Sequence, residues 1–136
     1  MTELEIPVFV FDQMVAQARA AVPIESCGIL AGQKNRIERL YEMTNIDNSP
    51  THYTMDPAEQ FTVVKRMRAA GLKMLAIYHS HPLTPARLSE EDHRLALTPD
   101  VAYLVLSLKD AENPCAKVFV VDQGQTRQIP LTIVKG

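Results

Sequence analysis

Leu-Lys-Met-Leu-Ala-Ile-Tyr-His-Ser-His-Pro, residues 72–82, is the stretch that decides the fold, because it joins an apolar strand to two histidines. The run from Leu72 to Tyr78 is mostly apolar, which is typical of a buried strand. In an extended strand, side chains at positions i and i+2 leave the same face, so His79 and His81 can direct their ring nitrogens to one point. The sequence therefore places two aligned imidazoles at the mouth of a buried strand.

A carboxylate further along the chain can complete a metal site with these two histidines. Asp92 is the nearest well-placed carboxylate that a turn after Pro82 can bring back to them. Catalytic zinc sites use three protein ligands and leave the fourth tetrahedral position to water. We therefore expect His79, His81 and Asp92 to form an open, catalytic zinc site.

Helix capping gives a second explanation for the same acidic stretch. The tetrad Ser-Glu-Glu-Asp at residues 89–92 is a good helix start. Ser89 would be the N-cap, and three acids would lie in the first turn, where the helix macrodipole favours negative charge. We expect this helix to begin at Ser89 and to end at Pro99. The capping and metal interpretations are compatible with each other.

Five positions together resemble the JAMM signature of the MPN+ metalloprotease family: Glu25, His79, His81, Ser89 and Asp92. The spacing matches, since seven residues separate the second histidine from the serine and two separate the serine from the aspartate. The glutamate lies in the expected Pro-x-Glu-x-x-Gly-Ile-Leu context of residues 23–30. The segment from Asn45 through Asp56, with its Asn-x-x-x-Ser-Pro and Tyr-x-Met-Asp-Pro patterns, also resembles the family, so the similarity covers most of the chain.

The resemblance implies a role for each of the five residues. His79, His81 and Asp92 would be zinc ligands, because neutral imidazole and carboxylate suit Zn²⁺. Glu25 would be the general base that takes a proton from the zinc-bound water and later delivers it to the leaving amine. Ser89 would donate a hydrogen bond to the oxyanion of the tetrahedral intermediate. The implied activity is that of a JAMM-type zinc metallopeptidase, in which a glutamate activates water.

The compact length of the chain bears on the substrate. Deubiquitinating relatives carry long insertions that bind ubiquitin, whereas residues 109–117 form only a short loop in this chain. The chain resembles the small prokaryotic members of the family, which implies a ubiquitin-like or sulfur-carrier protein as partner, cut by a peptidase or isopeptidase after its C-terminal Gly-Gly. Glycines suit a narrow zinc cleft, because bulky side chains on either side of the scissile carbonyl would collide with its walls. Residues 45–54, interpreted as a polar loop or edge segment, would pair with such a tail by strand addition.

Composition and charge exclude several other classes of protein. A chain of 136 residues with 46% hydrophobic residues fits one domain, expected to be a single catalytic domain over residues 1–136. The formal net charge is only −2 and no basic block occurs, so nucleic acid is not an expected partner. The N-terminal residues lack a cationic leader, and no apolar run approaches the ~20 residues of a membrane span. We therefore expect a cytoplasmic protein with no membrane partner.

The sulfur-containing residues are interpreted as structural. Cys27 and Cys115 are far apart and form no Cys-x-x-Cys motif, so neither a disulfide framework nor a thiolate zinc site is expected. Cys27 lies in an apolar strand and is expected to pack in the core. Met67 and Met74 are interpreted as core filler.

Helical and strand patterns alternate along the chain. Apolar residues at helical spacing predict a helix from Pro7 to about Ala21, and Asp56-Pro57 predicts the start of a second helix that ends at Gly71. The predicted strands span residues 27–31, 37–43, 72–78, 101–108, 116–121 and 126–133, with hairpin turns at 32–35 and 122–124. Together with the resemblance, this pattern predicts an α/β fold: a single-domain, MPN-like (cytidine-deaminase-like) sandwich whose mostly antiparallel, curved central sheet is flanked by helices.

Three other functions are compatible with parts of the pattern. One is that of a DNA-repair-associated relative with a similar motif, although the sequence has no helix-hairpin-helix module or basic face. A zinc nucleoside or nucleobase deaminase would need His-x-Glu followed by Pro-Cys-x-x-Cys, and the segment Pro-Cys-Ala-Lys at residues 114–117 has no second cysteine after it. A non-catalytic MPN scaffold or interaction protein is the stronger alternative, because many relatives with this fold have lost the metal. Those relatives typically lack one or more ligands, whereas all five signature residues are present here.

Overall fold

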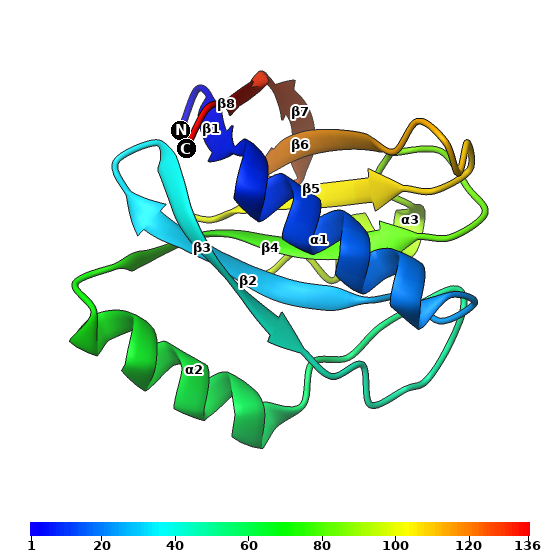
Figure 1. Ribbon diagram of the computed structural model, residues 1–136, viewed down its shortest axis with the longest axis horizontal. Helices are drawn as coiled ribbons and strands as arrows, with labels where there is room; N and C mark the ends of the chain where they lie inside the picture. Colours follow the sequence, from blue (N-terminus) through cyan, green and yellow to red (C-terminus); the bar gives the residue numbers. More distant parts are fainter.

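One mixed sheet of eight strands forms the centre of the computed structural model, which describes residues 1–136 (Figure 1). The strands are β1 (Leu4–Pro7), β2 (Cys27–Gln33), β3 (Arg36–Met43), β4 (Lys73–His81), β5 (Ala102–Ser107), β6 (Cys115–Asp122), β7 (Gln125–Ile129) and β8 (Leu131–Val134). Their order across the sheet is β7-β6-β5-β4-β2-β3-β1-β8. The β2–β3, β2–β4, β5–β6 and β6–β7 pairs are antiparallel, and the β1–β3, β1–β8 and β4–β5 pairs are parallel. The predicted α/β fold with a mostly antiparallel central sheet is therefore confirmed.

Helices cover both faces of this sheet. α1 (Val8–Ala21) crosses one face, as Figure 1 shows, and its buried residues join a core with alternate residues of the central strands. α2 (Pro57–Ala69) covers the other face, where Val63 and Met67 join a second core. The strand residues of this second core include Cys27, Ile29, Ile77 and Tyr103. The helices thus divide the interior into two layers, one on each side of the sheet.

The residues that begin and end α2 have the roles that the sequence predicts. The carboxylate of Asp56 accepts hydrogen bonds from the amides of Ala58 and Glu59, and Pro57 occupies the first helical position, where no donor is needed. Gly71 follows the helix with a φ of 74°, a conformation that glycine adopts without steric cost. The second predicted helix is therefore confirmed at both ends.

β4 carries both histidines through the middle of the sheet. It pairs with β2 in antiparallel fashion, with Cys27 opposite His79, and with β5 in parallel fashion, with Ser107 opposite His81. Since Cys27 and Ile77 lie in the core beneath α2, the alternation of side chains places both histidines on that same face. The pairing with β2 ends at His79, whereas the pairing with β5 continues through His81 and fixes the end of the strand that carries both rings.

The third helix is much shorter than predicted. α3 spans Glu90–Arg94, whereas the sequence predicted a helix that would run on to Pro99. The chain turns inward after this short helix, because Ala96 packs into the core beneath α2. The amide of Thr98 also donates a hydrogen bond to the hydroxyl of Tyr103. Tertiary contacts thus override the local helical pattern.

The last predicted strand is in fact two strands at opposite edges of the sheet. Pro130 separates β7 from β8, because proline has no N–H to donate to the ladder. β8 then pairs with β1, a strand that the sequence analysis missed. Leu4 and Ile6 of β1 are fully buried on either side of Glu5, and this short alternation was its only signal in the sequence.

Both ends of the chain lie beside the turn between β2 and β3, and Figure 1 shows them close together. Asn35 donates a hydrogen bond to the carboxylate of Glu3, and Arg36 donates one to the carbonyl oxygen of Gly136. β3 runs from this turn towards the end of β2 that pairs with His79. The histidines and the chain ends therefore lie at opposite ends of the strands.

Neither cysteine is in a disulfide, as the sequence predicts. Cys27 is buried, and burial raises the pKa of its thiol to about 12, so it packs as an uncharged side chain. Cys115 is exposed on β6. No helix of the structure combines the length and the apolar character needed to cross a membrane.

Gly32 lies where β2 approaches β3 too closely for a side chain. The register shifts between Ala31 and Gly32, and a Cβ atom on Gly32 would lie 1.9 Å from the carbonyl oxygen of Arg36. We expect Gly32→Ala to lower the free energy of unfolding by about 1–3 kcal/mol, as overpacking usually does. Urea denaturation measures the change. Gly136→Ala is the control, because its Cβ would meet only Phe9 at 3.5 Å; equal unfolding midpoints for the two variants would contradict the prediction.

Candidate metal centre

Three side chains converge at the end of β4. His79 Nε2 lies 3.0 Å from His81 Nε2 and 3.1 Å from Asp92 Oδ2, and the last two atoms are 3.2 Å apart. Ligands bound about 2.0–2.1 Å from one tetrahedral ion would lie about 3.3 Å from each other. The structure thus brings together the three residues that the sequence predicts as ligands, at a spacing that fits a metal ion.

Different contacts orient the two imidazole rings. His81 Nδ1 lies 3.0 Å from the carbonyl oxygen of Pro85, which can only accept a hydrogen bond, so the lone pair of neutral His81 is on Nε2, facing the centre. The ring of His79 stacks on Tyr53, with ring centroids 4.7 Å apart and an interplanar angle of 21°. The buried Nδ1 atom of His79 has no hydrogen-bond partner, so stacking on Tyr53 and the contact between its Nε2 atom and Asp92 hold this side chain. Sequence reasoning missed the Pro85 and Tyr53 contacts; the Tyr-x-Met-Asp-Pro motif was the only signal for Tyr53.

The protonation of the three side chains suits metal binding. Burial raises the pKa of Asp92, but hydrogen bonds with His79 and His81 outweigh burial and hold that pKa well below its usual range. Burial lowers the pKa of His79. Burial also lowers the pKa of His81, but its hydrogen bonds with Asp92 and with the carbonyl oxygen of Pro85 outweigh burial, so the net pKa is raised. An ionised carboxylate and neutral imidazoles are the forms that a metal ion binds, so a proton on His81 would leave on binding.

Ser89 and Asp92 form a reciprocal cap at the start of α3. The amide of Asp92 donates to Ser89 Oγ at 3.0 Å, and the amide of Ser89 donates to Asp92 Oδ2 at 3.0 Å. The capping interpretation of this stretch is therefore confirmed, and the same cap fixes the direction of the Asp92 carboxylate. Because Ser89 Oγ accepts in this cap, its own hydroxyl proton stays available to a group outside the helix.

Glu25 lies just before β2 and is buried, with only 3% of its surface exposed. Its carboxyl group lies near enough to His81 and Asp92 for their charges to affect its pKa. Burial raises the pKa of Glu25 from 4.5 to about 8, although the nearby charge of His81 lowers it. The Oε1 atom is buried and has no hydrogen-bond partner. A buried, unpartnered carboxylate beside a metal-binding group is what a base acting on a bound water requires.

A buried polar network joins the Glu25 segment to the histidine strand. Ser80, which lies between the two histidines, accepts a hydrogen bond from the Ser26 amide at 2.8 Å, and its own amide donates to the Ser26 carbonyl at 3.0 Å. The hydroxyls of Ser26 and Tyr78 are 2.6 Å apart, and Tyr78 donates to Gln17 of α1. These bonds fix the two segments relative to each other. Sequence reasoning found none of them, because they join residues far apart in the chain.

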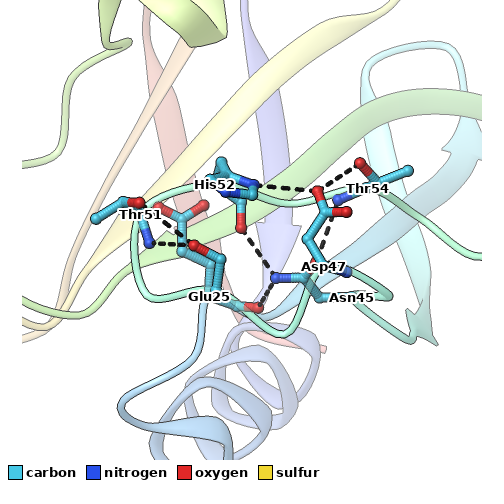
Figure 2. A network of polar contacts seen from close by, with 7 residues as sticks. Glu25, Asn45, Asp47, Thr51, His52 and Thr54 are labelled. Atoms are coloured by element: carbon cyan, nitrogen blue, oxygen red, sulfur yellow. Dashed lines mark hydrogen bonds and ion pairs between the residues drawn. The ribbon is translucent and has the colours of Figure 1, made fainter.

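Residues 44–56, called the Asn45 loop below, wrap around Glu25 (Figure 2). The segment is a loop and not an edge strand, since its only ladder contact is a single bridge between Asn45 and Met55. Its amides are largely used inside the loop, as in the bonds from Ile46 to the carbonyl of Thr54 and from Asn48 to that of Asn45.

A small cleft of about 160 Å³ opens next to the centre. It is lined by Tyr53, Thr54, Glu91, Asp92 and Leu95. The cleft therefore lies between the Asn45 loop and α3, with the Asp92 carboxylate in its wall. A larger hollow of about 540 Å³ lies around Pro85, Ser107 and Lys117 and contains none of the three converging side chains.

The sequence matches the prokaryotic homologues of the JAB domain across residues 7–120. A CysO-cysteine peptidase of Mycobacterium bovis is 38% identical over 124 residues, which cover 90% of this chain and 85% of that relative. A desampylase of Haloferax volcanii is 29% identical over 103 residues, which cover 71% of this chain and 74% of that relative. The similarity to both relatives thus extends over most of their length.

Two solved structures resemble the whole chain. The solution structure of a protein from Desulfitobacterium hafniense is 39% identical, with a TM-score of 0.91 over 98% of this chain and 94% of that one. The crystal structure of a JAB1/MPN domain protein from Archaeoglobus fulgidus is 19% identical, with a TM-score of 0.64 over 97% of this chain and 100% of that one. The second likeness shows the fold alone, and it confirms the predicted MPN-like architecture.

Proposed function

Because the chain belongs to the family of prokaryotic homologues of the JAB domain, we propose that residues 1–136 form one catalytic domain, a zinc-dependent metallopeptidase of the JAMM type. The observation that carries the proposal is the meeting of His79, His81 and Asp92 near Glu25, whose buried carboxylate has an oxygen without a hydrogen-bond partner. A non-catalytic scaffold would gain nothing from burying that carboxylate, since an unsatisfied buried polar group lowers stability. The arrangement therefore favours an enzyme over a scaffold.

His79, His81 and Asp92 would hold the zinc ion. When bound, the ion supplies Lewis acidity, which lowers the pKa of a coordinated water and polarises the scissile carbonyl. Glu25 accepts the proton of the attacking water at its carboxylate and then delivers it to the leaving amine. Burial raises the pKa of the Glu25 carboxyl in the metal-free protein, and the positive charge of a bound metal ion would lower it again, so that the carboxylate can accept a proton and later deliver it.

Ser89 would act on the oxygen of the scissile carbonyl. Its hydroxyl oxygen is engaged by the amide of Asp92, which fixes its position while leaving its proton free to donate. A donor aimed at the carbonyl oxygen as charge develops on it stabilises the transition state, and loss of one such donor typically costs about 10²–10³ in rate. We assign this role to Ser89.

The proposed substrate is a ubiquitin-like or sulfur-carrier protein, cleaved after its C-terminal Gly-Gly in the cytoplasm. The small cleft beside Asp92 supports a slim tail, because Tyr53 and Leu95 stand on its walls and leave little room for side chains. The names of the relatives, CysO-cysteine peptidase and desampylase, support the peptidase class. The compact chain, without long insertions, supports a small protein partner.

We expect the zinc-loaded enzyme to cleave a carrier that is extended beyond Gly-Gly at least about tenfold faster, in kcat/KM, than the same carrier with Ala-Val in place of Gly-Gly. The added methyl and isopropyl side chains would collide with the walls of the cleft, and a misfit of this size is worth about 10- to 200-fold. Mass spectrometry of the products over a panel of carriers measures both rates. Equal cleavage of the two tails would overturn the substrate assignment, and cleavage of neither by zinc-loaded enzyme would overturn the peptidase assignment.

A further inference from the structure

We propose that Asn45 is a positioning residue, which holds the main chain of Glu25 in the place that catalysis needs. The inference rests on the proposed role of Glu25 as general base. It gives a function to a motif that the metal centre leaves unexplained, the Asn-x-x-x-Ser-Pro segment at residues 45–50.

The Asn45 side chain uses its full hydrogen-bonding capacity. Its Nδ2 donates to the carbonyl oxygens of Glu25 and His52, each at 3.0 Å. Its Oδ1 accepts from the amides of Asp47 and Thr54, each at 3.1 Å. An amide side chain has two N–H donors and two lone pairs, so every one is engaged. Figure 2 shows this side chain at the centre of the network.

Glu25 depends on these contacts because it lies outside the sheet. β2 begins at Cys27, and the last bonds to β4 are made by Ser26. Glu25 itself is held by the Asn45 loop: its amide donates to the carbonyl of Ser49 at 2.9 Å, and its carbonyl accepts from Asn45. The main chain of the proposed base is therefore fixed by a loop on both of its polar groups.

The same side chain also fixes the wall of the metal centre. Its bonds to the carbonyl of His52 and the amide of Thr54 enclose Tyr53, whose ring stacks on His79. Asn45 thus holds both Glu25, the proposed base, and Tyr53, whose ring stacks on a predicted metal ligand, to the same loop. Loss of Asn45 would let the two shift relative to each other.

Asp47 offers a matched control inside the same loop. Its carboxylate accepts from the hydroxyl of Thr54 at 2.6 Å and lies 3.1 Å from His52 Nδ1. These bonds close the loop on itself and do not contact Glu25. Asp47→Ala therefore removes two side-chain contacts within the loop while leaving the Asn45 bond to Glu25 in place.

Asn45→Ala should lower kcat by about 10- to 100-fold with a smaller change in KM, because a displacement of about 1 Å at a reacting group can cost about 10²-fold. Asn45→Asp should share the loss, since aspartate keeps the two acceptor bonds but cannot donate to Glu25. It also provides the test if the alanine variant does not fold. Zinc content should stay at the wild-type level in both variants, and Asp47→Ala should keep most of its kcat.

A double variant separates positioning from general damage to the fold. If Asn45 acts through Glu25, then Asn45→Ala should change the residual kcat of Glu25→Gln by less than about threefold, because the group that it positions is already inactive. If the kcat losses of the two single variants instead multiplied in full in the double variant, the proposal would be overturned. Wild-type kcat in both Asn45 variants would also overturn it.

Amide hydrogen exchange gives a readout that does not depend on activity. The Glu25 amide should exchange faster in both Asn45 variants than in Asp47→Ala, while the amides of β2 keep their protection. Unchanged exchange at Glu25 in the Asn45 variants would overturn the anchoring role itself. A wild-type enzyme that cleaves no carrier would instead overturn the proposed function, and the catalytic role of Asn45 with it, whatever the exchange data show.

Discussion

Glu25→Gln is expected to bind zinc as the wild-type protein does and to lose about 10²–10⁴-fold of its turnover, the usual contribution of a general base. Glutamine has nearly the same shape, so the packing around residue 25 is kept. Its amide cannot accept the proton of the attacking water. Glu25 stands apart from the three converging side chains, so its loss should leave zinc content unchanged.

Two measurements on the same preparation decide the role of Glu25. Elemental analysis gives zinc per chain, and single-turnover cleavage of an extended carrier gives the rate. Glu90→Gln is the control, because Glu90 is an exposed carboxylate in the first turn of α3. Wild-type turnover in Glu25→Gln would remove Glu25 from the mechanism, and loss of zinc would make it a ligand.

The raised pKa of Glu25 gives the same variant a second signature. In the metal-free protein, the folded state binds this proton up to about pH 8, whereas the unfolded chain releases it near pH 4.5. The contribution of Glu25 to stability therefore falls as the pH rises between these two values. Metal-free Glu25→Gln lacks this contribution. The melting temperatures of wild type and variant should therefore diverge from pH 5 to pH 8, with the wild type losing more stability. If the melting temperatures of the two proteins changed in parallel with pH, the burial of the Glu25 carboxyl group would be contradicted.

His81→Ala and Asp92→Ala are each expected to reduce zinc from about one ion per chain to nearly none and to abolish zinc-dependent cleavage. Removing one of three protein ligands leaves too few donors for a stable tetrahedral site. The fold should survive, because neither residue belongs to the two hydrophobic cores on the faces of the sheet. Asp92→Ala should also lower stability by about 1 kcal/mol, since it removes one half of the cap at the start of α3.

Circular dichroism and elemental analysis together test this result. His93→Ala is the matched control, because His93 follows Asp92 directly but its ring contacts Thr126 and takes no part in the three-residue centre. It should keep its zinc. Full zinc occupancy in His81→Ala or Asp92→Ala would overturn the ligand assignment, and zinc loss in His93→Ala would show a different donor set.

The residues of the candidate site could be predicted where local geometry decides their position. The period of a strand fixes His79 and His81 on one face, and the cap of a short helix turns Asp92 back towards them. The α2 boundaries follow in the same way from Asp56 and Gly71. These features need only neighbouring residues, so the sequence contains the information.

Contacts between distant segments could not be predicted from local patterns. Tyr53 stacks on a ring 26 positions later in the sequence, and no periodicity marks such a pair. β1 was missed because its pairing with β8 depends on residues at the far end of the chain. The sequence predicted one strand across Pro130, because the change of sheet edge that follows this residue depends on the pairing of β8 with the distant β1. Tertiary structure decided each of these features.

The position of the chain ends has a practical consequence. Glu3 and Gly136 both contact the turn at Asn35 and Arg36, at the end of the strands remote from His79. A tag, fluorophore or fused protein attached at either end would therefore leave the molecule away from the cleft beside Asp92. Either end can carry a label or a surface attachment while the proposed substrate keeps free access to the candidate metal centre.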